Sequence, residues 1–341
     1  MTDILIELCS LPGPSGFEQP VTERVLKLLE PYMDETRIDV MGNVIAVRHC
    51  GRDNARKLLF DAHIDEPGLI VTGAEEGFLR VASLGGADAR QLPASVVRVL
   101  AEPPIFGVVC ATPPHVAKKE DAEKAIKLED MFIDVGLSQE ATEKAVPPGT
   151  PVVFAHGARQ HGGDGLCGKA LDDRSGFAAI LRAVELLKDE TLDVDLYIMA
   201  STQEEVGMRG AAPGVYAVKP DFSVIIDVNH AKTPDTKPQE ATSELGGGVI
   251  ISRGPNMNAR FTQAVINLAK AREIPYQIDV EPGGNSGTNA RVIQVSGTGV
   301  ATALFSLPMK YMHGAHEIVS LDDIESAARL LCETAKECAN V

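Results

Sequence analysis

The stretch Asp195–Gly207, DLYIMASTQEEVG, joins an apolar run directly to two adjacent glutamates. The run Asp195–Ala200 predicts a buried β-strand, because its length and apolar content are typical of core strands. Glu204 and Glu205 follow where that strand ends. Two neighbouring carboxylates repel each other unless a positive charge lies between them. The stretch therefore predicts a sheet that carries a charged site at one edge.

Similar apolar runs alternate with helical stretches through most of the chain, and this alternation is typical of an α/β domain. Further strands are predicted at Val44–Arg48, Lys57–Asp61, Asp221–Asp227, Tyr276–Val280 and Val300–Phe305. Helices are predicted at Arg174–Lys188, Asn258–Arg272 and Leu321–Cys338. Near the start, Ser15 and Glu18 form the pattern S-x-x-E. This pattern predicts a capping box that opens a helix ending before Pro31.

The segment from Val71 to about Val153 has a different pattern. Its apolar runs are short and are separated by prolines and glycines. They lie at Phe78–Ser83, Val96–Ala101, Ile105–Cys110 and Met131–Val135. Short strands with frequent turn signals predict a small β-barrel or sandwich. The charged stretch 118–130 is expected to form a mobile loop. We therefore predict an α/β domain made of residues 1–70 and 155–341, interrupted by a β-domain at 71–154.

Composition excludes several classes of protein. The formal net charge of −16 argues against binding to nucleic acid or to anionic membranes, which carry the same sign of charge. No apolar run approaches the length of a membrane span, and no secretion signal is expected at the N-terminus. The six cysteines form no C-x-x-C pair, so reduced thiols and a cytoplasmic location are expected. The absence of tryptophan and the 4% aromatic content argue against a carbohydrate site.

Short polar motifs follow the predicted strands, and open α/β sheets bind their ligands at such strand ends. After the strand Lys57–Asp61, His63 and Asp65 lie on one face of an extended segment. A carboxylate in this position orients a ligating imidazole. Asp172 and Asp173 precede a helix, so they would either cap that helix or hold cations.

Two further motifs add a carboxylate and a histidine. Asp227 follows the apolar run Phe222–Ile226, and His313 follows a later one, with His316 as an alternative to it. Histidine and carboxylate ligands suit zinc, cobalt or manganese. Two such ions would hold a bridging hydroxide as nucleophile, and a glutamate that binds no metal would carry its proton to the leaving amine. The motifs together predict a two-metal hydrolase.

Five segments in this order resemble the M42 metallo-aminopeptidases of the tetrahedral (TET) group. They are AHIDEPGLIV at 62–71, KALDDRSG at 169–176, STQEEVGMRGA at 201–211, IIDV at 225–228 and LPMKYMHGAHE at 307–317. The resemblance runs through nearly the whole chain. It implies a mixed sheet flanked by helices, as in other zinc exopeptidases, with an inserted PDZ-like β-domain that drives oligomerisation. It also implies a tetrahedral dodecamer that removes N-terminal residues from short peptides with a free amino end.

The resemblance also implies a role for each residue of the site. Metal ligation would fall to His63, Asp172, Glu205, Asp227 and His313. Asp172 would bridge two divalent ions, zinc or cobalt or alternatively manganese, through a cis peptide to Asp173. Glu204 would be the general base, and Asp65 would orient His63.

The chain departs from the family pattern at a few places. Asn289 stands where an aspartate is usual, Lys310 where arginine is usual, and Gly314-Ala315 where Ser-Pro is usual. These positions are expected near the substrate pocket, so they leave the preferred first residue of the peptide open. Two alternatives also remain. One is a related two-metal amidohydrolase, deacetylase or carboxypeptidase, and the other is an assembly protein that has lost catalysis.

Overall fold

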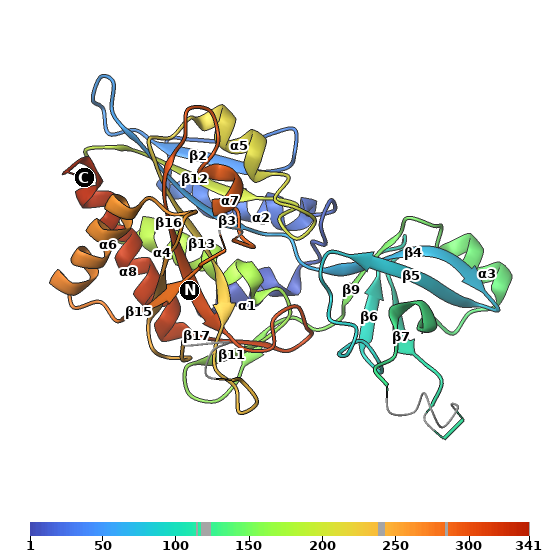
Figure 1. The fold of residues 1–341 in the computed structure, drawn as a ribbon. Helices are drawn as coiled ribbons and strands as arrows, with labels where there is room; N and C mark the ends of the chain where they lie inside the picture. Colours follow the sequence, from blue (N-terminus) through green and yellow to red (C-terminus); the bar gives the residue numbers. More distant parts are fainter. Residues whose placement is uncertain (114, 117–123, 238–242, 284–285, 341) are drawn as a thin grey trace.

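A central mixed sheet organises the larger part of the molecule (Figure 1). The computed structural model describes all residues except 114, 117–123, 238–242, 284–285 and 341. In this described part, eight strands pair in the order β1-β2-β12-β3-β13-β16-β14-β15. Their bounds are Glu35–Ile38 (β1), Val44–Arg48 (β2), Lys57–His63 (β3), Asp195–Ser201 (β12), Phe222–His230 (β13), Val249–Arg253 (β14), Tyr276–Val280 (β15) and Ala301–Met309 (β16). The predicted α/β class with a mixed sheet is confirmed.

The four middle strands β12, β3, β13 and β16 run parallel to one another. Their carboxyl ends therefore meet at one edge of the sheet. Strands β2 and β14 pair antiparallel to β12 and β16. This arrangement brings the segments that follow the middle strands close together, although they are far apart in the sequence.

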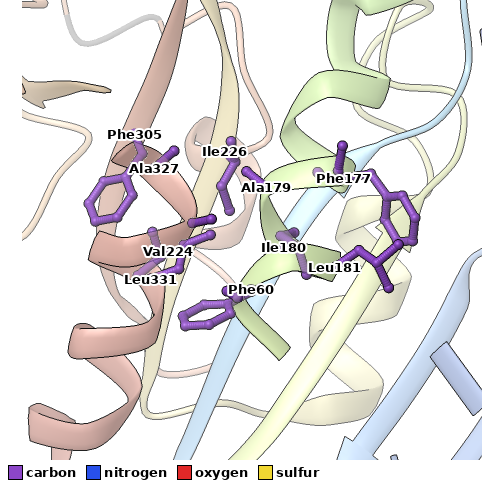
Figure 2. Close-up of a cluster of buried hydrophobic side chains, with 14 of the residues drawn as sticks. Phe60, Phe177, Ala179, Ile180, Leu181, Val224, Ile226, Phe305, Ala327 and Leu331 are labelled. Carbon is purple, nitrogen blue, oxygen red and sulfur yellow. The ribbon is translucent and has the colours of Figure 1, made fainter. Parts of the chain in front are cut away.

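Helices cover both faces of the sheet because alternate residues of each buried strand point to opposite sides. On one face, Phe60 and Val224 pack with α4 and α8, as Figure 2 shows. On the other face, Leu59 and Ile225 pack with α5 and α7. The helices are Thr2–Ser10 (α1), Gln19–Leu29 (α2), Leu171–Leu186 (α4), Ala211–Val218 (α5), Ala259–Ala271 (α6), Ala290–Ile293 (α7) and Leu321–Glu337 (α8), with 3-10 turns at Glu30–Tyr32 and Cys338–Asn340. None of the described helices has the length and apolar content that crossing a bilayer requires.

Six strands of the described chain close into a barrel, which projects to the right in Figure 1. They pair in the order β4-β5-β8-β7-β6-β9. The strands are Gly68–Glu75 (β4), Phe78–Leu84 (β5), Val96–Val99 (β6), Ile105–Cys110 (β7), Phe132–Asp134 (β8) and Pro151–Phe154 (β9), with a helix at Gln139–Ala145 (α3) and a 3-10 turn at Leu128–Asp130. The barrel has its own apolar core. Part of the mobile loop predicted at 118–130 lies outside the described residues.

A short antiparallel sheet connects the start of α4 to the last part of the chain. It contains β10 (Arg159–Gln160), β11 (Gly165–Gly168) and β17 (Glu317–Ser320) within the described residues. In its register, Gly168 is opposite Glu317. The segment that enters α4 is therefore held beside the segment that follows β16.

The predicted capping box at Ser15 and Glu18 is wrong. Helix α2 begins at Gln19, and Glu18 makes no side-chain cap. Instead, the Ser15 hydroxyl donates to Asp65 Oδ2 at 2.7 Å. Glu18 Oε1 accepts from the backbone amides of Gly16 and Gln203, at 2.7 and 3.1 Å. These side chains bind loops near the sheet edge instead of the amides of their own helix.

The strand predictions also need correction. Asp227 does not end its strand, because β13 continues to His230 in register with β16 up to Met309. Strand β14, Val249–Arg253, was not predicted, although four of its five residues are buried. Strand β1 was not predicted either. Its residues Glu35–Ile38 are mostly exposed and lack an apolar run, so only pairing with β2 identifies them as a strand.

A buried ion network fixes α1 and α4 to the end of β3. Both carboxylate oxygens of Glu66 lie 2.7 Å from Lys169 Nζ, and Glu66 Oε1 lies 3.2 Å from Arg174 Nη2. Arg174 also donates to three backbone carbonyls, those of Leu8, Leu11 and Ile64. All three charged side chains are buried. Burial lowers the pKa of Lys169, and the Glu66 carboxylate opposes that effect.

Removing the carboxylate of this network should destabilise the fold. Replacing Glu66 with glutamine leaves two cations buried without their partner, which costs about 3–5 kcal/mol in comparable sites. The matched control is Glu7→Gln, which breaks the more exposed pair with Arg24 and should cost at most about 1 kcal/mol. Guanidinium unfolding of both variants in the presence of a chelator measures the difference. Equal losses in the two variants would contradict the role of the buried network.

Candidate metal centre

The carboxyl edge of the sheet gathers the predicted site residues. His63 is the last residue of β3 and pairs with Ser201 at the end of β12. The loop after β12 carries Glu204 and Glu205, and β13 carries Asp227. Asp172 enters from the first turn of α4 and His313 from the segment after β16. Apart from the adjacent Glu204 and Glu205, these residues come from different elements, and the sheet topology brings them together.

Asp172 lies between two imidazoles. Its Oδ1 is 3.0 Å from His63 Nε2, and its Oδ2 is 3.4 Å from His313 Nε2. Glu205 Oε1 is 3.5 Å from the same nitrogen of His313. Ligand atoms of His63, Asp172 and Glu205 all lie within 4.8 Å of one another. One carboxylate oxygen of Asp172 therefore faces His63 and the other faces His313.

The two aspartates of the DD pair have separate tasks. The Asp172–Asp173 peptide is cis. Asp173 Oδ1 accepts from the amide of Gly176 at 3.0 Å, as a helix-capping side chain does. Asp172 points to the histidines instead. The capping interpretation is thus found for Asp173, and the cation-binding role of Asp172 stays a prediction.

Carboxylates crowd this site in excess of positive charge. Burial raises the pKa of Glu204 to about 7, and neighbouring acidic groups add to the effect. Burial and the charge of Asp172 raise the pKa of Glu205 well above its usual range. The pKa of Asp227 is also raised well above its usual range. Burial is the main cause, the charges of Asp172 and Glu204 add to it, and His63 acts against it. Asp227 belongs electrostatically to the same group.

The pKa values of both histidines are raised as well, but by their carboxylate neighbours and not by burial. Burial by itself would lower the pKa of His63, but hydrogen bonds with Asp172 and Asp65 raise it well above its usual value. A hydrogen bond with Asp172 also raises the pKa of His313. In turn the two histidines hold the pKa of Asp172 low, against the effect of its burial. The imidazoles and the Asp172 carboxylate thus each favour the charged form of the other.

The donor set fits divalent metal ions. Two buried oxygens of the site, Glu204 Oε1 and Glu205 Oε1, have no hydrogen-bond partner among the described residues. Buried polar atoms normally find a partner, so such orphans indicate a missing ligand. Imidazole and carboxylate are the ligands that zinc, cobalt and manganese bind. The structure contains residues of the types that a metal centre needs, and ligand atoms of three of them, His63, Asp172 and Glu205, lie close together.

The buried carboxylate of Asp65 contacts several residues of the site. It is fully buried, and its Oδ1 lies 3.4 Å from His63 Nδ1. The same carboxylate accepts from the backbone amides of Glu204 and Glu205, at 3.0 and 3.2 Å. Asp65 therefore positions both the imidazole of His63 and the loop that carries the two glutamates.

Glu317 was not predicted as a functional residue. Its Oε2 accepts from the amides of Leu171 and Asp172, at 2.9 and 3.2 Å, and its Oε1 accepts from the amide of His313 at 2.9 Å. The side chain is buried. It joins the segments of two candidate ligands that are far apart in the sequence. No sequence signal beyond its place in the last motif could have identified this role.

The second histidine of the last motif and two of the departures from the family pattern lie at different places around the site. His316 is exposed, whereas His313 faces the site. Asn289 is buried under the site, where its Nδ2 donates to Asp61 Oδ2 at 2.9 Å and to Ser201 Oγ at 2.8 Å. Lys310 exchanges backbone hydrogen bonds with Ile318. Asn289 therefore supports the ends of β3 and β12 beside the candidate site, and its effect on the substrate pocket stays a prediction.

Comparison with known proteins identifies the family. The family model of the M42 glutamyl aminopeptidases matches residues 42–330. Lysyl aminopeptidase of Pyrococcus furiosus is 34% identical, over 96% of this chain and 94% of that protein. A TET aminopeptidase from a Thaumarchaeota archaeon has a similar structure, with a TM-score of 0.93, 32% identity and coverage of 98% and 95% of the two chains. The TET1 peptidase of Pyrococcus horikoshii, whose structure was solved as a tetrahedron or an octahedral shell, gives a TM-score of 0.86, 30% identity and coverage of 98% and 99%. From the motifs, the fold and these similarities together, the chain belongs to the M42 family of aminopeptidases and is a peptide hydrolase.

Proposed function

We propose that this chain is a two-metal aminopeptidase that removes N-terminal residues from short peptides. The observation that carries the proposal is the position of Asp172, which offers one oxygen toward His63 and the other toward His313. A carboxylate shared in this way suits two ions about 3.5–4 Å apart. Together with Glu205 and Asp227, these residues would form the ligand set. Zinc or cobalt would occupy it, with manganese as the alternative.

The chemistry divides between the ions and the side chains. When bound, the ions would supply Lewis-acid chemistry, which makes water acidic and polarises a carbonyl group. Glu204 is buried, and its Oε1 has no hydrogen-bond partner among the described residues, so that oxygen is available to a proton. A general base works best when its pKa is near the working pH, and burial raises the pKa of Glu204 to about 7. Glu204 would take a proton from the attacking water and deliver it to the leaving amine.

The role of Glu204 makes a direct prediction. Glu204→Gln keeps the size of the side chain but removes the basic oxygen, so kcat should fall roughly 100- to 10,000-fold. The metal content of the variant, measured by elemental mass spectrometry, should equal that of the parent protein. The comparison variant Glu205→Gln should instead lose metal. Parent activity in Glu204→Gln, or loss of metal from it, would refute the assignment.

Cleavage of a peptide pool tests the reaction itself. The metal-loaded protein should remove residues stepwise from the free amino end, and mass spectrometry of the products follows each step. Chelator should stop the reaction, because it removes the ions that would polarise the carbonyl group. N-acetylated copies of the same peptides should stay intact. Loss of residues from the carboxyl end would favour the carboxypeptidase alternative, and no cleavage with any of the three metals would favour a repurposed assembly protein.

We also infer that residues 71–154, PDZ-like by resemblance, mediate self-association into a tetrahedral dodecamer. Two observations support this. The similar TET1 peptidase assembles into a tetrahedron or an octahedral shell. The barrel also exposes apolar side chains on β6 and β7, with Phe106 66% exposed beside Val96 and Val108. Exposed apolar clusters of this kind are typical of protein interfaces.

Light scattering after size exclusion tests the assembly. The parent protein should have the mass of twelve chains, and Phe106→Glu should yield smaller species because it places a charge on the apolar cluster. A parent protein that elutes as a monomer would contradict the proposal.

The cytoplasm is the proposed location. All six cysteines lie within the described residues, and each is free. Unpaired thiols are typical of proteins in a reducing compartment.

A further inference from the structure

We propose that the loop between β5 and β6 of the barrel is a positioning element of the metal centre, acting through Gly86 on His313. The proposal rests on the function above, in which His313 is a metal ligand. It goes further because it assigns part of the metal site to the inserted barrel. The loop comes from a different part of the fold than β3, β12, β13 and α4, which carry the other candidate ligands.

The backbone carbonyl of Gly86 determines which nitrogen of His313 is free. His313 Nδ1 lies 3.0 Å from this oxygen. A carbonyl can only accept, so Nδ1 must carry the proton and donate it. The opposite nitrogen, Nε2, points to Asp172 and Glu205 at 3.4 and 3.5 Å. A hydrogen bond of this kind sets the tautomer and ring orientation of a ligating histidine and raises its basicity.

The position requires glycine because the loop passes too close to the imidazole for any side chain. A Cβ atom at Gly86 would lie 2.7 Å from His313 Nδ1 and 3.0 Å from its Cε1. The backbone of Gly86 has no positive φ, so its conformation alone would accept other residues. The requirement therefore comes from the contact with the imidazole ring. Carbonyl and ring can approach to hydrogen-bond distance only because the side chain is absent.

The backbone of His313 is held on two sides. It adopts φ +63°, a left-handed conformation that is unfavourable for a residue with a side chain. Its carbonyl accepts from the amide of Asp88 in the barrel loop at 3.2 Å. Its own amide donates to Glu317 at 2.9 Å. The barrel loop and the catalytic domain together hold His313 in this conformation.

The same loop touches the neighbours of His313 as closely. A Cβ atom at Gly314 would lie 2.0 Å from Gln91 Oε1, so this glycine makes room for a side chain of the loop. On the other side, a Cβ atom at Gly85 would lie 3.2 Å from the Cβ of Glu205. The departure from the family pattern at Gly314 thus has a local explanation. The loop packs against the segments of two candidate ligands, His313 and Glu205.

A single methyl group tests the proposal. In Gly86→Ala, the added methyl group should push the His313 ring away while leaving the backbone intact. The matched control is Gly73→Ala in β4 of the same barrel, where an added Cβ would meet no atom within 4 Å. Both proteins are stripped of metal and titrated with zinc by calorimetry against a competing chelator. We expect affinity in Gly86→Ala to fall about 10- to 100-fold, the usual effect of losing a partner of a metal ligand, with Gly73→Ala unchanged.

Two further measurements separate the possible outcomes. Thermal unfolding of the metal-free proteins should be equal for Gly86→Ala and Gly73→Ala, because the methyl group meets only the ring of a side chain. If Gly86→Ala fails to fold, Gln91→Ala decides, since it loosens the loop on Gly314 without adding atoms and should also weaken zinc binding. Parent affinity in the folded variants overturns the proposal. A parent protein that binds no zinc instead overturns the metal centre itself, so the two failures are distinct.

Discussion

The carboxylate of Asp172 lies between His63 and His313, and several surrounding contacts hold it there. Glu317 holds the backbone of Asp172 and of His313 with one side chain. The buried pair of Glu66 and Arg174 then fixes the first turn of α4 against the end of β3. These are charged groups in the core, where they stabilise little unless each is fully paired. Their main effect is to position the backbone, because they link segments that are far apart in the sequence.

The sequence predicts the sheet well because its signal is local. Apolar runs of strand length mark most strands of the sheet, although the run in β14 was missed, and β15 was predicted with its observed bounds, Tyr276–Val280. The predictions failed where contacts with distant segments determine the local structure. The S-x-x-E pattern at Ser15 and Glu18 is a sound helix signal, yet both side chains bind the site loops instead. Strand β1 has no apolar pattern and exists through its pairing with β2.

The site shows the same limit at the level of single residues. Residue type and position after a strand identified His63, Asp172 and Glu205, which the fold brings within one cluster. The same signal could not separate His313 from His316, because both follow β16 and only the path of the chain turns one of them inward. Glu317 acts by accepting backbone amides from distant segments, and Gly86 by lacking a side chain at a close contact. Neither kind of role has a signature in the residue itself.

The place of the barrel in the chain follows from these contacts. The chain leaves the sheet directly after His63, builds the barrel from Gly68 to Phe154, and returns to enter α4 at Leu171. The insertion thus separates the first candidate ligand from the second. While it is away from the sheet, its loop reaches back to His313 and Glu205. A domain that served only assembly would need no such contact. A movement of the β5–β6 loop would therefore shift the candidate ligand His313 or break its hydrogen bond with Gly86, so the barrel and the candidate site are physically linked.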